Sequence, residues 1–156
     1  MKRDLGYAAI AAVSVVAVLV LGQIATFPHL EPWYAGLAKP TFNPPNWVFG
    51  PAWTALYALM GFALWRVLRS ADRLRRVAVL LFTVQLLLNA AWSWMFFAAE
   101  NPGAGLVNII PQWIVIVATA AVFWRVDRIA GLCLLPLIAW VGFATALNFE
   151  IWRLNG

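Results

Sequence analysis

Neutral polar side chains recur at helical spacing inside the apolar part of this chain. Gln85, Asn89 and Ser93 follow one another at intervals of four residues, so a single helix would carry all three on one face. Asn108 and Gln112 repeat this spacing in the next apolar segment. Because amides are costly to expose to lipid, both faces are predicted to point into a helix bundle. There they either hydrogen-bond between helices or contact a ligand in a cavity.

The interiors of the apolar segments carry no Asp, Glu, Lys, Arg or His. Ion pumps and proton-coupled carriers need such groups within the membrane, so the sequence argues against both. It also lacks an acid, base or nucleophile for ordinary turnover there. His29 stands alone in a loop, and Cys133 is the single cysteine, so no metal site and no internal disulfide are predicted.

The ten tryptophans divide by depth. Five fall at helix ends or in the first loop, as is typical of the membrane interface, namely Trp33, Trp47, Trp65, Trp124 and Trp152. At a rise of 1.5 Å per residue, the other five lie about 7–14 Å below one membrane boundary. These are Trp53, Trp92, Trp94, Trp113 and Trp140. Together they predict an aromatic pocket for a large, flat, apolar ligand; ordinary core packing is the alternative.

Composition defines the class of protein that must position these side chains. Of 156 residues, 64% are apolar and 11% charged, with a mean hydropathy of +0.83. Soluble domains have about 45–50% apolar and about 25% charged residues. The composition therefore excludes a soluble enzyme, a nucleic-acid-binding protein and a disordered regulator. It predicts one integral membrane domain over residues 1–156.

Five charge-poor stretches are each long enough to cross about 30 Å of hydrocarbon as a helix. Helices satisfy their own backbone hydrogen bonds in lipid, so the predicted fold is an all-α bundle of five transmembrane helices. The predicted helices lie near 5–26, 47–68, 77–99, 104–124 and 129–152.

Basic residues are distributed unequally between the two predicted membrane sides. One side carries nine of them: Lys2, Arg3, Arg66, Arg69, Arg73, Arg75, Arg76, Arg125 and Arg128. The other side carries Lys39 and Arg153. Because positive charge is retained in the cytoplasm, the amino terminus is predicted to be cytoplasmic, in a multi-pass protein of the bacterial cell membrane.

The connection over residues 27–46 is the longest between predicted helices, and its five prolines prevent a continuous helix. Its aromatic residues predict a rigid lid that packs onto the end of the bundle. The candidate lid residues are Trp33, Lys39, Pro40, Phe42, Pro44, Pro45 and Trp47.

Three segments together resemble one known family. Residues 33–60 read WYAGLAKPTFNPPNWVFGPAWTALYALM, residues 89–97 read NAAWSWMFF, and residues 135–155 read LPLIAWVGFATALNFEIWRLN. This pattern resembles the translocator protein family, also called the tryptophan-rich sensory protein (TspO/MBR) or peripheral-type benzodiazepine receptor family. The resemblance covers essentially the whole chain.

The resemblance implies a usually dimeric five-helix protein that binds porphyrins, haem, sterols and benzodiazepine-type ligands. It further implies roles in tetrapyrrole metabolism and stress responses, and in some members light-dependent porphyrin breakdown. The family's pocket tryptophans match Trp53 and Trp140, its helix-three amide matches Asn89, and its small pocket residue matches Ala144. The full set of candidate ligand-binding residues is Trp53, Asn89, Trp92, Trp140, Phe143, Ala144 and Asn148.

The sequence departs from this family's pattern at two places. Leu137 stands where a Tyr is common, and the proposed cholesterol motif is degenerate at Leu147, Phe149 and Arg153. A porphyrin or haem is therefore the better expectation than a sterol.

We expect a membrane sensor or carrier that needs no resident cofactor, with a homodimer and membrane lipid or sterol as further partners. Light-driven porphyrin breakdown through Trp53 and Trp140, and transport of tetrapyrroles or sterols, remain the alternatives.

Overall fold

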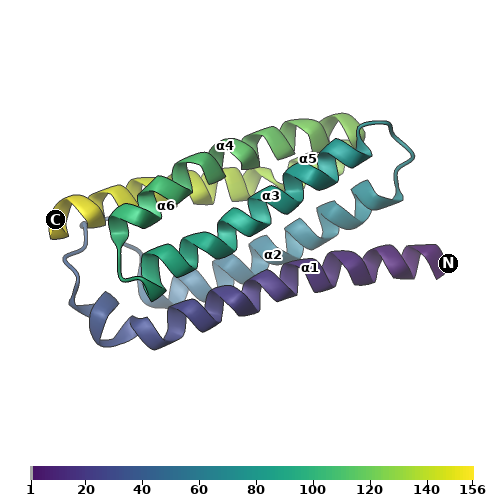
Figure 1. The fold of residues 1–156 in the computed structure, drawn as a ribbon. Coiled ribbons are helices and arrows are strands. Elements are labelled where there is room, and N and C mark those ends of the chain that lie inside the picture. The colour runs from purple at the N-terminus through teal and green to yellow at the C-terminus, as the bar shows by residue number, and fades with distance from the viewer. Residues whose placement is uncertain (1) are drawn as a thin grey trace.

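The computed structural model describes residues 2–156 and contains five helices long and apolar enough to span a membrane (Figure 1). The described residues form no β-strand, so the predicted all-α fold with five spanning helices is confirmed. The helices are α1 (Lys2–Thr26), α2 (Asn46–Arg69), α3 (Arg75–Ser93), α4 (Pro102–Val126), α5 (Arg128–Cys133) and α6 (Leu135–Asn155). Short helical turns η1 (Phe27–His29), η2 (Leu30–Tyr34) and η3 (Trp94–Ala98) extend α1 and α3.

Local sequence explains where the later helices begin. The side chain of Asn101 accepts a hydrogen bond from the Ala104 amide at 2.9 Å and caps α4, whose first residue is Pro102. Asp127 caps α5 in the same way through Ala130. The single helix predicted over 129–152 is instead α5 followed by α6, with Leu134 between them.

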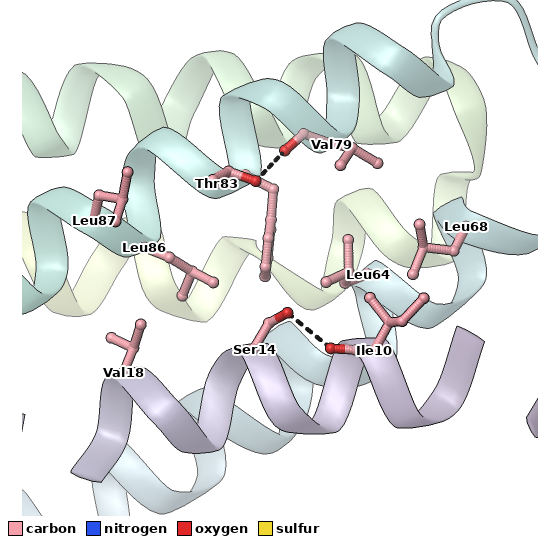
Figure 2. Close-up of a pocket in the computed structure, with 10 residues that line it drawn as sticks. Ile10, Ser14, Val18, Leu64, Leu68, Val79, Thr83, Leu86 and Leu87 are labelled. Carbon is pink, nitrogen blue, oxygen red and sulfur yellow. Dashed lines mark hydrogen bonds between the residues drawn. The ribbon is translucent and has the colours of Figure 1, made fainter. Parts of the chain in front are cut away.

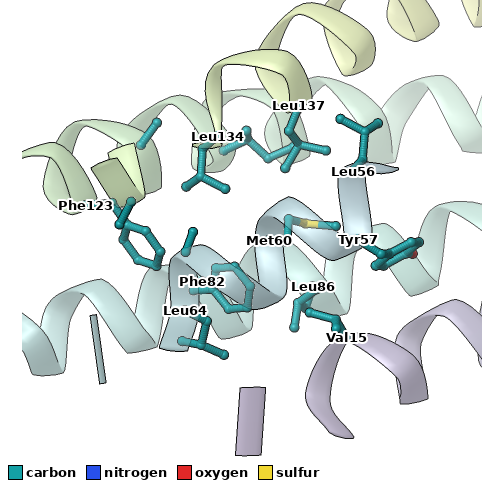
Figure 3. Packing of buried hydrophobic residues seen from close by; sticks show 14 of the residues in the cluster. Val15, Leu56, Tyr57, Met60, Leu64, Phe82, Leu86, Phe123, Leu134 and Leu137 are labelled. Carbon is teal, nitrogen blue, oxygen red and sulfur yellow. The ribbon is translucent and has the colours of Figure 1, made fainter. Parts of the chain in front are cut away.

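The core of the bundle consists of interlocked aliphatic and aromatic side chains (Figure 3). Met60 is completely buried at its centre, and the rings of Phe82 and Phe123 stack at 5.6 Å between α3 and α4. A second, smaller cluster lies around Phe96 and Phe97 and includes Tyr34. Shape-complementary packing of this kind is what associates helices in lipid, because burial from lipid gives no hydrophobic gain.

The two ends of the bundle differ in charge. One, the basic end, holds the amino terminus and the α2–α3 and α4–α5 connections; the other, the loop end, holds residues 35–45 and the carboxyl terminus (Figure 1). Nine basic and three acidic residues belong to the basic end, against two basic and three acidic at the loop end. The fold thus separates the basic residues as predicted.

An ion pair joins α2 to the α4–α5 turn at the basic end. Arg66 Nη2 lies 2.8 Å from Asp127 Oδ2, and its Nε donates to both carboxylate oxygens at 3.0 Å. These hydrogen bonds hold the pKa of Asp127 below its usual value.

Candidate ligand-binding site

Four aromatic rings from three segments form a continuous series at the loop end. Phe42 of the loop meets Phe143 of α6 at 6.1 Å, and Phe143 lies 6.0 Å from Trp140 one turn earlier. Trp140 in turn meets Phe49 of α2 edge-on at 5.9 Å. We call these four residues, together with Trp53, the loop-end aromatic cluster. It brings together Trp140, Phe143 and Phe42 as predicted and adds Phe49.

Trp53 extends the cluster deeper along α2. It is half-buried, and its ring lies 5.7 Å from that of Tyr57, four residues further on. The Tyr57 hydroxyl donates a 2.7 Å hydrogen bond to the side-chain oxygen Oδ1 of Asn89, so a buried pair joins α2 to α3. Sequence reasoning identified Asn89 but missed Tyr57 and Phe49. Both lie four residues from Trp53, which is the spacing of one helix face.

Ala144 lies one turn after Trp140 on α6, half-buried and packed against the main core. Ala144 and Trp140 thus pack against the core from the same face of α6.

Trp92 and Asn148 connect helices beside this series, since Trp92 packs against the same second core cluster as Phe49 and Phe143. The indole N–H of Trp92 donates to Asn148 Oδ1 at 3.0 Å, while Asn148 Nδ2 donates to the Pro102 carbonyl at 2.7 Å. Asn148, which is 1% exposed, thereby joins α3, α4 and α6. The side-chain oxygen and nitrogen of Asn148 are therefore both engaged in hydrogen bonds between helices.

The remaining amides point inward, as predicted, with different outcomes. Asn108 is buried and donates to the Leu88 carbonyl at 2.8 Å, which joins α4 to α3. Gln85 and Gln112 are buried as well, yet their Oε1 atoms have no hydrogen-bond partner among the described residues. Interhelical bonding therefore accounts for Asn89 and Asn108, and it leaves one carbonyl on each glutamine unpaired.

Lys39 organises the beginning of the loop. Its ammonium group donates to the carbonyls of Tyr34, Ala35 and Leu37 at 2.5, 3.3 and 3.1 Å and lies over the Tyr34 ring. Burial lowers the pKa of this lysine. Lys39 thus closes the end of a helical turn and serves the conformation of the loop.

The loop is also fastened to the end of α6. The Ala38 amide donates to Asn155 Oδ1 at 3.0 Å, and Asn155 Nδ2 donates back to the Ala38 carbonyl at 2.9 Å. Sequence reasoning missed Asn155, because nothing in its spacing relates it to a residue more than a hundred positions earlier. This reciprocal pair holds the loop over α6.

The prolines set the path of the rest of the loop. The Pro40 carbonyl accepts from the Asn43 amide at 3.0 Å, and Asn43 Nδ2 donates to the Pro44 carbonyl at 3.0 Å. Pro45 is the extended residue immediately before α2. Three predicted lid prolines therefore shape a turn that ends at the first residue of the helix.

Several tryptophans are not part of the ring series from Phe42 to Phe49. Trp33 packs edge-on against Phe96 at 5.7 Å in the second core cluster, and Trp47 is 75% exposed at the start of α2. Trp94 and Trp113 are 47% and 38% exposed, so the prediction that all five deep indoles surround one pocket is wrong for these two. The indole N–H of Trp113 bonds the Ile138 carbonyl at 3.0 Å on the bundle surface. Depth in the sequence does not give the direction in which a side chain points.

Two apolar hollows lie elsewhere, along α1. A crevice of about 220 Å³ opens between α1, α2 and α3, and a groove of about 400 Å³ follows α1 and α2. Neither is lined by Trp53 or Trp140. Within the loop-end aromatic cluster, Phe42 covers Phe143, which in turn packs beside Trp140.

Five spanning helices with an aromatic cluster beneath a proline-rich loop define a multi-pass membrane protein. Residues 9–153 match the model of the TspO/MBR family, and this chain belongs to that family. The chain is 47% identical to the Tryptophan-rich protein TspO of Chlorobaculum tepidum over 79% of both chains. It is 44% identical to the protein of the same name from Archaeoglobus fulgidus, over 91% of this chain and 94% of that one.

A vertebrate relative is similar over nearly the same length. Identity to the human Translocator protein is 40%, over 79% of this chain and 75% of that protein. These matches confirm the resemblance drawn from the three sequence segments. Membership of the family supports a role as a membrane receptor or sensor.

Proposed function

We propose that this protein binds a porphyrin or haem at the loop-end aromatic cluster and acts as a sensor of tetrapyrroles. The observation that carries the proposal is the ring series from Phe42 through Phe143 and Trp140 to Phe49, with Trp53 below it. Aromatic faces favour flat apolar ligands, with about 0.5–1.5 kcal/mol per ring pair beyond the burial of area.

The chemistry of the cluster favours recognition by stacking over coordination of a metal. Its five members are Phe and Trp, whose side chains do not coordinate haem iron, and the Tyr57 hydroxyl beside it is engaged with Asn89 Oδ1. His29 is not part of the ring series: its Nδ1 lies 3.1 Å from Oε1 of Glu100, a residue that follows η3. The proposed pocket therefore accepts a metal-free porphyrin as readily as haem.

The loop is proposed to act as a gate for this ligand. Phe42 is exposed on one side and contacts Phe143 on the other, so movement of this residue opens the route to Trp140. The Lys39 and Asn155 hydrogen bonds hold the closed conformation. Binding should thus protect residues 37–43 from amide exchange if the loop closes again over the ligand.

The orientation that we propose places the amino terminus in the cytoplasm. The separation of nine basic residues from two is the basis for this orientation. The loop-end cluster then opens to the outside of a bacterial cell membrane. A reporter fused after Gly156 should be active only outside the cytoplasm, and cytoplasmic activity of a folded fusion would contradict the orientation.

Titration with protoporphyrin IX, followed through quenching of tryptophan fluorescence, tests the proposed ligand. In Ala144→Thr the added methyl and hydroxyl groups crowd the surface beside Trp140, which should cost about 1–3 kcal/mol of binding free energy. We expect binding to weaken by about 5- to 150-fold, since 1.4 kcal/mol is a factor of ten. The matched control is Ala146→Thr, at an exposed position of the same helix, which should bind as the wild type does. Equal affinities in all three proteins would remove the site from α6.

Light-dependent breakdown of the bound porphyrin is a second function that the half-buried indoles of Trp53 and Trp140 favour. Electron transfer from an indole to an excited porphyrin needs no acid, base or metal in the pocket, and dissolved dioxygen would have to serve as the oxidant that opens the ring. Porphyrin loss under illumination, compared with a dark sample of the same complex, separates this function from binding alone.

A further inference from the structure

The crevice between α1, α2 and α3 is suited to a hydrocarbon chain. Its lining includes Ile10 and Ser14 of α1, Leu68 of α2, and Val79, Thr83 and Leu87 of α3 (Figure 2). The Ser14 and Thr83 hydroxyls each donate to a carbonyl of their own helix, at 2.7 and 2.9 Å. With these donors engaged, the lining presents a dry, apolar surface.

The size of the crevice argues against a tetrapyrrole and for a single chain. Its volume of about 220 Å³ is below the roughly 300–1,000 Å³ of pockets for drug-sized ligands. Along α3 it extends from Val79 to Leu87, or about 12 Å at 1.5 Å per residue. That length approaches half of the roughly 30 Å hydrocarbon core, which is the depth of one leaflet.

Each helix that lines the crevice carries arginine at the same end. On α1, Arg3, Tyr7 and Ile10 share one face, and Arg3 hydrogen-bonds the Tyr7 hydroxyl. On α2, Arg69 follows the lining residue Leu68 directly. On α3, Arg76 precedes Val79 by one turn, and the crevice therefore points toward the basic end.

Two arginines near this end are free to bind an anion. Arg69 pairs with Asp4 at 2.7 Å, and Arg75 donates to the carbonyls of Leu68 and Ser70. Arg73 and Arg76 are exposed, and within residues 2–156 neither side chain forms a hydrogen bond or an ion pair. Guanidinium groups bind phosphate strongly through paired N–H donors.

We propose that this crevice is a binding site for one anionic phospholipid, with an acyl chain between α1 and α3 and the phosphate against Arg73 and Arg76. Charge complementarity selects the head group, and the apolar lining holds the chain. The site is independent of the proposed porphyrin pocket, which lies at the opposite end of the bundle.

Photocrosslinking in lipid vesicles tests this site on the full-length protein. The probe is phosphatidylglycerol with a diazirine in the middle of its acyl chain, at trace level in phosphatidylcholine vesicles. Peptide mapping should find label concentrated in residues 10–18 and 79–87. Label spread evenly over all five helices, or equal labelling by a phosphatidylcholine probe, would overturn the proposal.

A matched pair of charge variants separates this site from general attraction to a basic surface. Arg73→Gln/Arg76→Gln should reduce labelling of the crevice at least fivefold. The control Arg125→Gln/Arg128→Gln removes the same charge from the same end and should leave labelling of the crevice unchanged. Equal losses in both variants would contradict a specific site. If the first variant fails to fold, competition on the wild-type protein decides. Unlabelled phosphatidylglycerol must then displace the probe at a lower concentration than phosphatidylcholine, and equal competition would refute the proposal.

Discussion

The two sides of the bundle are held together by different interactions. On the side of α3, α4 and α6, polar links join the helices, buried at Asn148 and Asn108 and at the surface at Trp113. Beyond the ion pair of Asp4 with Arg69, helix α1 meets its neighbours through aliphatic side chains, and no side chain of residues 8–26 hydrogen-bonds another helix. Both apolar hollows lie along this helix.

This difference indicates a division of labour. In lipid, close packing and interhelical hydrogen bonds are what hold helices together. The α3–α4–α6 side can therefore keep Trp140 and Phe143 in place, while the α1 side can accommodate lipid chains and small rearrangements. Substitutions on the α3–α4–α6 side should therefore lower the free energy of unfolding more than substitutions on α1.

The largest effect is expected where α4 packs against its neighbours. A Cβ at Gly105 would lie 2.9 Å from Phe96 Cδ2 and 3.0 Å from Asn148 Oδ1. Gly105→Val should therefore lower the free energy of unfolding in mixed micelles by about 3 kcal/mol, through overpacking and displacement of the Asn148 amide. The control Gly6→Ala adds a methyl group in open space on α1 and should stabilise the helix slightly. Similar losses in the two variants would mean that α4 is not closely packed here.

The second prediction compares two buried amides that differ in how fully they are hydrogen-bonded. Asn148→Leu leaves the Trp92 N–H without its partner and removes a bond to the Pro102 carbonyl, and it should cost about 1–2 kcal/mol in the same unfolding measurement. Gln85 Oε1 has no partner among the described residues and Gln85 Nε2 donates only to Met60 Sδ, at 3.6 Å, so Gln85→Leu should be close to neutral. A larger loss from Gln85→Leu would show that the glutamine, and not Asn148, holds the bundle.

The third prediction concerns pH dependence at the basic end. Arg66 holds the pKa of Asp127 below its ordinary value, so their pairing stabilises the protein above pH about 4. This contribution should be lost as pH falls from about 4 through the folded-state pKa. Because the pair is partly exposed, it should amount to less than about 1 kcal/mol. Asp127→Asn retains a helix-capping side chain and should remove that part of the pH dependence in acid unfolding, and an unchanged profile would exclude the pair as its source.

The smallest effect on stability is expected at the loop. Asn155→Ala removes both hydrogen bonds to Ala38, yet the site is exposed, so the free energy of unfolding should change by less than about 0.5 kcal/mol. Amide exchange in residues 37–43 should nonetheless become several-fold faster. Asn155→Asp keeps the acceptor for the Ala38 amide and should have an intermediate effect. Exchange at the wild-type rate in both variants would show that the loop is held by other contacts.

The sequence predicted those parts of the fold that depend on local composition and periodicity. Apolar stretches of about 20 residues identified the five spanning helices, and four-residue spacing identified the buried faces of Asn89 and Asn108. Composition could not locate the break at Leu134, because Pro136 is compatible either with a kink inside one helix or with the first turn of a new one.

The candidate site was predicted less completely, because it depends on how helices rotate against one another. The residues Trp140, Phe143 and Phe42 come together as expected, but Asn148 and Trp92 serve as a link between helices. Trp94 and Trp113 have the right depth and point outward. Contacts such as that of Asn155 with Ala38 join residues far apart in the chain, and no single-sequence pattern relates them.

If a porphyrin stacks in the loop-end aromatic cluster, replacing both tryptophans of that cluster must lower the affinity for the porphyrin. In absorbance titrations with protoporphyrin IX, Trp53→Phe and Trp140→Phe should each weaken binding less than tenfold, because phenylalanine keeps most of the apolar ring. The double variant Trp53→Phe/Trp140→Phe should bind the porphyrin more weakly than the wild type. Under illumination, any loss of porphyrin should fall much more steeply than binding, since the indoles are gone. The control Trp124→Phe/Trp152→Phe changes two exposed indoles outside the cluster and should match the wild type in both measurements. Wild-type binding and wild-type photochemistry in Trp53→Phe/Trp140→Phe would contradict the assignment of the pocket.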